Sequence, residues 1–172
     1  MTSKRVAVLV EFNYEDLEVW YPLLRFREEL GIETFSVGPE KGKMYQSKKG
    51  YPCKSDKSID EVSAQDIDAL IIPGGWAPDY WRRDKRFLDL VTDMFAASKT
   101  VAAICHGAWL LCSADVLKGR KATCFHSIKD DVKNAGAVYE DAAVVVDGNL
   151  VTSRVPADLP QFCKAIIAQL KA

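Results

Sequence analysis

Cys105 has the sequence surroundings of a reactive thiol. A run of apolar residues, 100–104, ends at this cysteine, and His106 and Gly107 follow it directly before a helical pattern begins. This order predicts a sharp strand-to-helix turn that projects the thiol from the end of a sheet. The N-terminus of the following helix favours the thiolate, which is the nucleophilic form of cysteine. The pattern therefore indicates a cysteine nucleophile, with His106 as a candidate general base toward substrate.

Two carboxylates after the first predicted strand are candidate partners of this thiol. Glu15 and Glu18 are three residues apart, so they share a face if the segment is helical. A carboxylate beside a thiolate would have a raised pKa and would share its proton with the sulfur; the alternative is a pair of solvated carboxylates at a helix start. We expect Glu18 to contact the sulfur. Neighbouring side chains at a turn can diverge, so we expect the His106 ring to point elsewhere.

A glycine pair follows the third predicted strand. Gly74 and Gly75 allow close approach of the backbone and unusual φ values. Their N–H groups, together with the N–H of His106, could receive an oxyanion. The simpler interpretation of the pair is a tight turn.

The elements that must position these residues alternate along the chain. The apolar patterns predict the following strands and helices: strands at 6–10, 33–37, 67–72, 100–104 and 121–124, helices at 15–30, 85–98, 105–118, 127–135 and 158–170, an exposed hairpin or loop at 38–51, and a strand pair at 144–152. Strands that are apolar on both faces and alternate with helices predict an α/β fold with a mostly parallel sheet covered on both sides. In such sheets the site lies beyond the carboxyl ends of the strands.

The first predicted helix carries two further expectations. Its apolar residues recur at helical spacing and are expected to form the buried face: Leu17, Trp20, Leu23, Leu24 and Leu30. Pro22 is expected in a first turn or a kink, because proline lacks the N–H that an interior helical position needs.

Composition excludes several classes of protein. The 172 residues fit one domain, 1–172, and 48% hydrophobic with 27% charged residues fit a packed core inside a polar surface. A net charge of −1 gives no global attraction to nucleic acid or anionic membrane. No apolar run approaches the roughly 20 residues that span a bilayer, and no secretory cleavage pattern occurs at the start, so we expect a cytoplasmic protein.

The five cysteines do not have the spacing of a disulfide-bonded scaffold. Their spacing is irregular and no C-x-x-C pair occurs, so neither a disulfide scaffold nor a zinc site is expected, and we expect no metal or other cofactor. Cys53, in a polar segment, is expected to be exposed. Cys112, Cys124 and Cys163 are expected to be buried packing residues.

These segments resemble the ThiJ/PfpI superfamily, which includes a protein deglycase associated with Parkinson disease and the PfpI-type intracellular proteases. The PfpI-like branch is the most similar. The matching segments span almost the whole chain: 14–18 with Pro22, 73–79, 103–107, 113–121, 130–136 and 152–160.

The resemblance implies a flavodoxin-like three-layer sandwich with Cys105 as nucleophile and Glu18 as its carboxylate partner. It also implies that His106 pairs with an acid from a neighbouring subunit, at the position of Asp79, so that the active unit is a homodimer or a larger assembly such as a hexamer. Where the deglycase branch has a histidine near the thiol, this chain has Phe125, and His126 follows one residue later. That shift turns a side chain to another face, so a mechanism through His126 is not expected.

Three functions remain open on these residues. The first is glyoxalase III-like or deglycase chemistry on methylglyoxal and its adducts with proteins. The second is an intracellular cysteine peptidase, in which Cys105 is acylated and His106 protonates the leaving amine. The third is a redox sensor or chaperone that acts through oxidation of Cys105.

Overall fold

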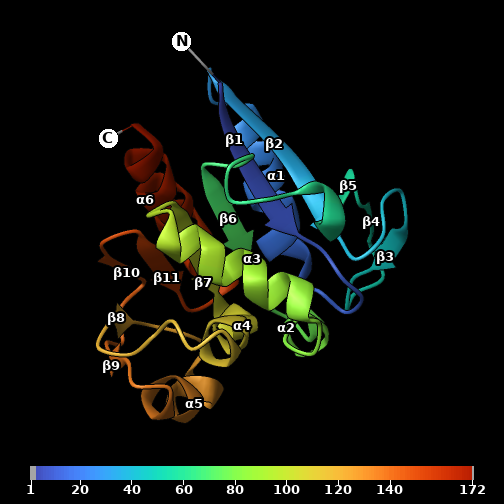
Figure 1. The fold of residues 1–172 in the computed structure, drawn as a ribbon. Coiled ribbons are helices and arrows are strands. Elements are labelled where there is room, and N and C mark those ends of the chain that lie inside the picture. The colour runs from blue at the N-terminus through green and yellow to red at the C-terminus, as the bar shows by residue number, and fades with distance from the viewer. Residues whose placement is uncertain (1–2, 172) are drawn as a thin grey trace.

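A seven-stranded sheet forms the centre of the structure, a computed structural model that describes residues 3–171 (Figure 1). The strands follow the order β10-β11-β7-β6-β1-β2-β5. Their bounds are β1 Lys4–Leu9, β2 Ile32–Gly38, β5 Lys57–Ser58, β6 Ala69–Ile72, β7 Thr100–Ile104, β10 Val144–Asp147 and β11 Leu150–Ser153. Each neighbouring pair in this sheet is parallel except β10 and β11, which form the strand pair predicted at 144–152.

Helices cover both faces of this sheet, as the alternating pattern predicts. Their bounds are α1 Asp16–Arg27, α2 Ala77–Trp81, α3 Lys85–Ala96, α4 Ala108–Ser113, α5 Lys129–Asn134 and α6 Leu159–Lys171. Helices α1 and α6 contact each other on one face, and α3 crosses the other face in contact with α4 (Figure 1). Strands β6 and β7 are buried along their whole length, because helices lie on both sides of them. The α/β sandwich predicted from the sequence is confirmed.

Helix α1 differs from its prediction in the face that it buries. Leu17 and Leu24 are 55% and 54% exposed, and Leu30 lies beyond the end of the helix. The buried face instead contains Glu18, Val19, Pro22, Leu23 and Phe26. Pro22 lies inside this one helix, not in its first turn, and it cannot donate to the carbonyl oxygen of Glu18 four residues earlier. Of the predicted leucines only Leu23 is buried, because the buried face of α1 is centred on the side that contains Glu18 and not on the most apolar side.

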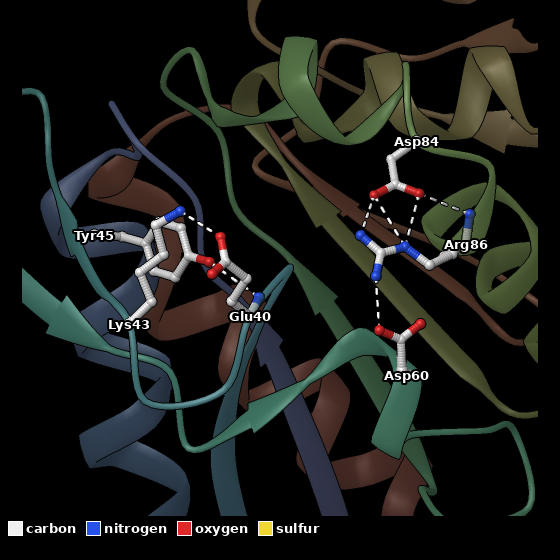
Figure 2. Close-up of polar contacts among 6 residues, drawn as sticks. All are labelled: Glu40, Lys43, Tyr45, Asp60, Asp84 and Arg86. Carbon is white, nitrogen blue, oxygen red and sulfur yellow. Dashed lines mark hydrogen bonds and ion pairs between the residues drawn. The ribbon is translucent and has the colours of Figure 1, made fainter.

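The segment predicted as an exposed loop at 38–51 is fastened to the fold. It contains β3 (Met44–Gln46), which pairs antiparallel with β4 (Pro52–Lys54). Tyr45 is fully buried, and its hydroxyl accepts a hydrogen bond from the backbone N–H of Glu40 at 3.1 Å. Figure 2 shows this contact beside the Lys43–Glu40 ion pair of 2.5 Å. Cys53, directly opposite Tyr45 in the strand pair, is only 1% exposed, so its expected exposure is wrong.

A second polar cluster in Figure 2 fixes the start of α3. The Asp84 carboxylate accepts from the backbone N–H of Arg86 at 3.0 Å, which caps the helix. The Arg86 guanidinium contacts Asp84 at 2.6 Å and Asp60 at 2.7 Å, and thereby joins α3 to the segment before β6. These contacts fix the start of α3 against the segment that leads into β6.

Two short strands complete the fold. β8 (Lys121–Ala122) pairs parallel with β9 (Val138–Tyr139) outside the main sheet. The strand predicted at 121–124 is therefore shorter than expected. Among residues 3–171, no helix combines the length and the apolar character that crossing a membrane requires.

Candidate active site

Cys105 lies at the sharp turn that the sequence predicts. Strand β7 ends at Ile104, a single 3-10 turn covers 105–107, and α4 begins at Ala108. The φ angle of Cys105 is 60°, a left-handed conformation that is costly for a side chain with a Cβ. A Cβ on Gly107 would lie 2.3 Å from the carbonyl oxygen of Ile72, so only glycine fits behind the thiol. The backbone therefore holds Cys105 in one strained orientation.

Glu18 lies against this cysteine on the opposite side of Gly74. A Cβ on Gly74 would be 2.7 Å from Glu18 Oε2 and 2.8 Å from Cys105 Cβ, so the glycine is sandwiched between the two side chains. The N–H of Gly74 donates to Glu18 Oε2 at 2.7 Å. The other oxygen, Oε1, is buried and has no hydrogen-bond partner among residues 3–171 by distance and angle. A proton on Oε1 would remove the negative charge from this buried, unpartnered oxygen.

The environment favours that proton. Burial raises the pKa of Glu18 to about 8, against the lowering effect of the Gly74 N–H. Burial, and then the charge of Glu18, also raise the pKa of the Cys105 thiol, while the N–H groups of His106 and Gly75 lower it. The expectation that the pKa of the carboxyl beside the thiol is raised agrees with this environment, and the sharing of a proton stays a prediction. The expectation that the helix N-terminus would dominate the thiol pKa is not supported, because the thiol is only 9% exposed.

His106 contacts the sulfur, which corrects the expectation that its ring points elsewhere. Its Nδ1 lies 3.3 Å from Cys105 Sγ, and its Nε2 lies 3.4 Å from Ser127 Oγ. The ring packs against Trp109 and Phe125, with centroids 4.9 and 5.0 Å away. Burial lowers the pKa of His106, so the ring is neutral at neutral pH and one of its nitrogens can accept a proton.

The two glycines after β6 have different tasks. The N–H of Gly74 donates to Glu18. It is therefore not free to stabilise an oxyanion, which the sequence had suggested as its role. Gly75 has a φ of 75°, and a Cβ there would lie 2.4 Å from the carbonyl oxygen of Asn13. Its N–H and that of His106 both face the Cys105 sulfur. An oxyanion site at this position would therefore consist of Gly75 and His106.

The remaining acids that the sequence singled out lie at the edge of the site. Glu15 precedes α1 and forms an ion pair with Lys48, and both side chains line the cavity above Cys105. Asp79 lies in α2 and pairs with Arg83 at 2.9 Å, not with His106 of the same chain. Within residues 3–171, no group of three His, Cys, Asp or Glu side chains is placed to hold a metal ion.

The site is a cavity of about 510 Å³, here called the Cys105 cavity. Its lining combines the predicted residues with four others that the sequence did not single out as functional. The lining residues are Glu15, Glu18, Lys48, Gly75, Trp76, Cys105, His106, Phe125 and Pro156. Lys48 was missed because its segment had the composition of an exposed loop. Trp76, Phe125 and Pro156 lie within or beside motif segments, and that proximity was the available signal.

His126 lies outside this site. Phe125 lines the Cys105 cavity, whereas His126 lines a separate cavity of about 180 Å³ that contains Arg154, here called the Arg154 cavity. The other lining residues of the Arg154 cavity are Cys124, Tyr139, Asp141 and Val155. This placement agrees with the expectation that the one-residue shift directs His126 to another face.

Comparisons with known proteins identify the family. The family model described as DJ-1/PfpI family matches residues 4–169. The chain is 47% identical over 172 residues to protein/nucleic acid deglycase 2 of Escherichia coli, covering 99% of both chains. It is 44% identical over 169 residues to the putative cysteine protease YraA of Bacillus subtilis, covering 98% of this chain and 99% of the other.

A solved structure gives the same result. The chain superposes with a TM-score of 0.94 on a two-domain protein from Anabaena variabilis that contains DJ-1/ThiJ/PfpI-like and ferritin-like domains. Sequence identity is 40%, and the match covers 98% of this chain and 48% of that one. With the cysteine elbow, its buried glutamate and these matches over nearly the full length, the chain belongs to the DJ-1/PfpI family.

Proposed function

We propose that this protein is a cysteine-dependent enzyme that acts on reactive carbonyl compounds, such as methylglyoxal and its adducts with amines. The observation that carries the proposal is the Cys105 thiol beside a buried Glu18 whose pKa is raised to about 8. A small aldehyde fits a cavity of about 510 Å³. The deglycase name of a 47% identical relative supports this substrate class.

The first step is addition to the aldehyde. The sulfur of Cys105 forms a bond to the aldehyde carbon as its proton passes to the neutral His106, 3.3 Å away. The protonated Glu18 gives its own proton to the carbonyl oxygen and becomes a carboxylate. The N–H groups of Gly75 and His106 stabilise the negative charge on that oxygen during the addition. With a glycated amine, the sulfur displaces the amine, which leaves with a proton. Both substrates give the same hemithioacetal.

The second step moves hydrogen within the bound intermediate. The Glu18 carboxylate removes the proton from the carbon bonded to sulfur and returns it to the neighbouring carbon, while the hydroxyl proton moves to the neighbouring carbonyl oxygen. This converts the hemithioacetal into a thioester, and the proton held by His106 returns to Glu18. His106, neutral at neutral pH, then takes a proton from water, which attacks the thioester. The products are lactate and the restored thiol. The net reaction adds one water to methylglyoxal.

Lactate formation tests this proposal. Methylglyoxal, or a purified methylglyoxal adduct of N-acetyl-lysine, is incubated with the wild type and with the Cys105→Ser variant. We expect lactate from the wild type and a loss of at least about 10³-fold in the variant, because the nucleophile is gone. A folded wild type that produces no lactate, or a variant that produces as much, would reject the proposal. The adduct, free of methylglyoxal, distinguishes deglycase from glyoxalase activity.

A cysteine peptidase is the second candidate. Two observations favour it: the 3.3 Å contact between Cys105 Sγ and His106 Nδ1, and the protease name of a 44% identical relative. In this reaction Cys105 is acylated and His106 protonates the leaving amine. Cleavage of a fluorogenic peptide by the wild type and its loss in Cys105→Ala would support it. Cleavage that survives in Cys105→Ala would exclude this mechanism.

We further propose that Asp79 orients His106 of a neighbouring subunit. In one chain Asp79 pairs with Arg83 and leaves 29% of its side chain exposed. An apolar groove of about 390 Å³ along α1, lined by Leu17, Trp20 and Leu24, supports association of copies of this chain. If Asp79 acts in this way, mixed Asp79→Ala and Cys105→Ala chains regain part of the activity. No recovery despite demonstrated subunit exchange would reject this role.

A further inference from the structure

Lys48 is the one fixed positive charge on the lining of the Cys105 cavity, among the lining residues in the described range 3–171. Glu18 keeps its proton at neutral pH because burial raises its pKa to about 8, and His106 is neutral because burial lowers its pKa. Glu15 is the remaining lining acid, and it pairs with Lys48. The charges that an arriving substrate meets are therefore those of Glu15 and Lys48.

The Lys48 ammonium group is held in place yet open to a further partner. The backbone N–H of Lys48 donates to the Tyr14 carbonyl at 3.0 Å, which joins this loop to the start of α1. The Lys48 side chain is 47% exposed, whereas Glu15 is only 13% exposed. An ammonium group has three donors, and Glu15 occupies one side of it. The side chain is half exposed on the cavity lining, so the ammonium group is accessible to a further partner.

The charge of Lys48 also reaches the reacting groups. It lowers the pKa of Glu18 and that of His106, and a thiolate at Cys105 in turn raises the pKa of Lys48. Lys48 and all three of these side chains line the Cys105 cavity. A negative charge that develops on a molecule bound to Cys105 is therefore within reach of Lys48.

We propose that Lys48 is the anion-recognition residue of this cavity, and that it binds a carboxylate on the carbon next to the sulfur of Cys105. This inference rests on the proposed function, because in that reaction the lactate carboxylate forms from the carbon that was bonded to sulfur, one bond from the position that Lys48 is proposed to bind. It extends the substrate class to electrophiles whose reacting carbon carries a carboxylate, such as 2-oxo acids of the glyoxylate type. Neutral electrophiles of the same size bind less well.

Two alkylating reagents of equal size test the assignment. Iodoacetate carries a carboxylate on its reacting carbon, and iodoacetamide carries a neutral amide there. With each, the Cys105 sulfur forms a bond to carbon, iodide leaves with the electron pair, and the thiol proton passes to solvent. The second-order rates at Cys105 are measured by mass spectrometry, and their ratio reports recognition of the carboxylate alone.

We expect the iodoacetate-to-iodoacetamide ratio to fall about five- to tenfold in Lys48→Met, the range of a partly exposed ion pair. Lys48→Arg should retain most of the ratio. Lys49→Met is the matched control, because it removes the same charge one residue later from an exposed side chain outside the cavity. Glu15→Gln should raise the ratio, since it frees Lys48 from its partner.

An unchanged ratio in folded Lys48→Met at low salt would overturn the inference. An equal fall in Lys49→Met would also overturn it, because the effect would then come from the general surface charge. Alkylation needs no turnover, so the result is independent of the proposed function. If the ratio falls in Lys48→Met while the wild type makes no lactate, the proposed reaction fails and the anion site stands.

Discussion

Two cavities of this protein contain the same kinds of side chains in different arrangements. The Cys105 cavity has a cysteine, a histidine, a lysine and two glutamates; the Arg154 cavity has a cysteine, a histidine, an arginine and an aspartate. The first measures about 510 Å³ and the second about 180 Å³. Residue types alone do not distinguish the two cavities. The positions and contacts of their side chains do.

The thiols differ first. Cys105 stands on a turn with a φ of 60° at the end of β7, next to a buried acid and a neutral imidazole. Cys124 follows β8 and is fully buried. Burial raises the pKa of both thiols, so the pKa does not separate them. A thiol without a proton acceptor and without exposure is a packing residue. The strained turn is what separates the two cysteines.

The cations differ as well. Arg154 donates to Asp158 at 3.0 Å and 3.3 Å and to Asp141 at 2.8 Å, so two carboxylates face its single positive charge. Lys48 has one carboxylate partner, Glu15, and remains half exposed. The charge of Arg154 is therefore more than balanced by the protein, whereas Lys48 faces a single acid. This contrast favours the Cys105 cavity as the site of chemistry.

The largest expected effect separates the two thiols. Cys105→Ser should lower lactate formation from methylglyoxal by at least about 10³-fold, because a serine hydroxyl at this position is a far weaker nucleophile. Cys124→Ser should keep turnover within about twofold and cost about 1–2 kcal/mol of unfolding free energy, because it buries a hydroxyl in place of a thiol. Steady-state rates and urea denaturation of both variants measure this. Equal loss of turnover in the two would contradict the assignment.

The next effect concerns the buried acid. Glu18 has a folded-state pKa of about 8, above its ordinary value of 4.5, so the folded protein holds an extra proton between these pH values. Stability from this group is complete below about pH 4.5 and is lost as pH rises through 8. Glu18→Gln removes the ionisation, and its amide oxygen can still accept from Gly74. We expect the variant to gain on the order of 3 kcal/mol over the wild type at pH 9 relative to pH 5.

Urea denaturation at several pH values measures this difference. Glu28→Gln is a suitable control, because Glu28 is an exposed carboxylate at the end of the same helix. The control should follow the wild type across the whole pH range. If Glu18→Gln also follows the wild type, Glu18 ionises normally and cannot share a proton with Cys105.

The sequence was sufficient to predict the parallel sheet and the elbow at Cys105. Both depend on local sequence patterns: β6 and β7 are apolar on both faces, and Gly107 follows the cysteine at the turn. The structure explains the glycine, because a Cβ there would meet the Ile72 carbonyl. Spacing singled out Glu15 and Glu18, and the family resemblance assigned Glu18 its role as the partner of Cys105. The buried face of α1 could not be predicted from the spacing of apolar residues, because it contains Glu18, an acid that lies at the active site.

Contacts between distant segments were also out of reach of the sequence. Lys48 and Cys53 lie in a stretch whose composition is that of a solvated loop, yet the β3–β4 pair and the buried Tyr45 fold it against the start of α1. The direction of the His106 ring was wrong for the same reason. Its orientation depends on Trp109 in α4 and on Phe125 and Ser127, which lie together in the segment after β8.

The smallest expected effect separates the two histidines. His106→Gln should lower lactate formation by about 10²-fold, because the base that activates water is lost while the nucleophile remains. The rate of Cys105 alkylation by iodoacetamide should change far less, since Glu18 stays in contact with the sulfur. His126→Gln should leave both rates within about twofold, because His126 is exposed and faces the Arg154 cavity. If His126→Gln abolishes turnover and His106→Gln does not, the imidazole that serves Cys105 is the one across Phe125, and the two cavities act as one site.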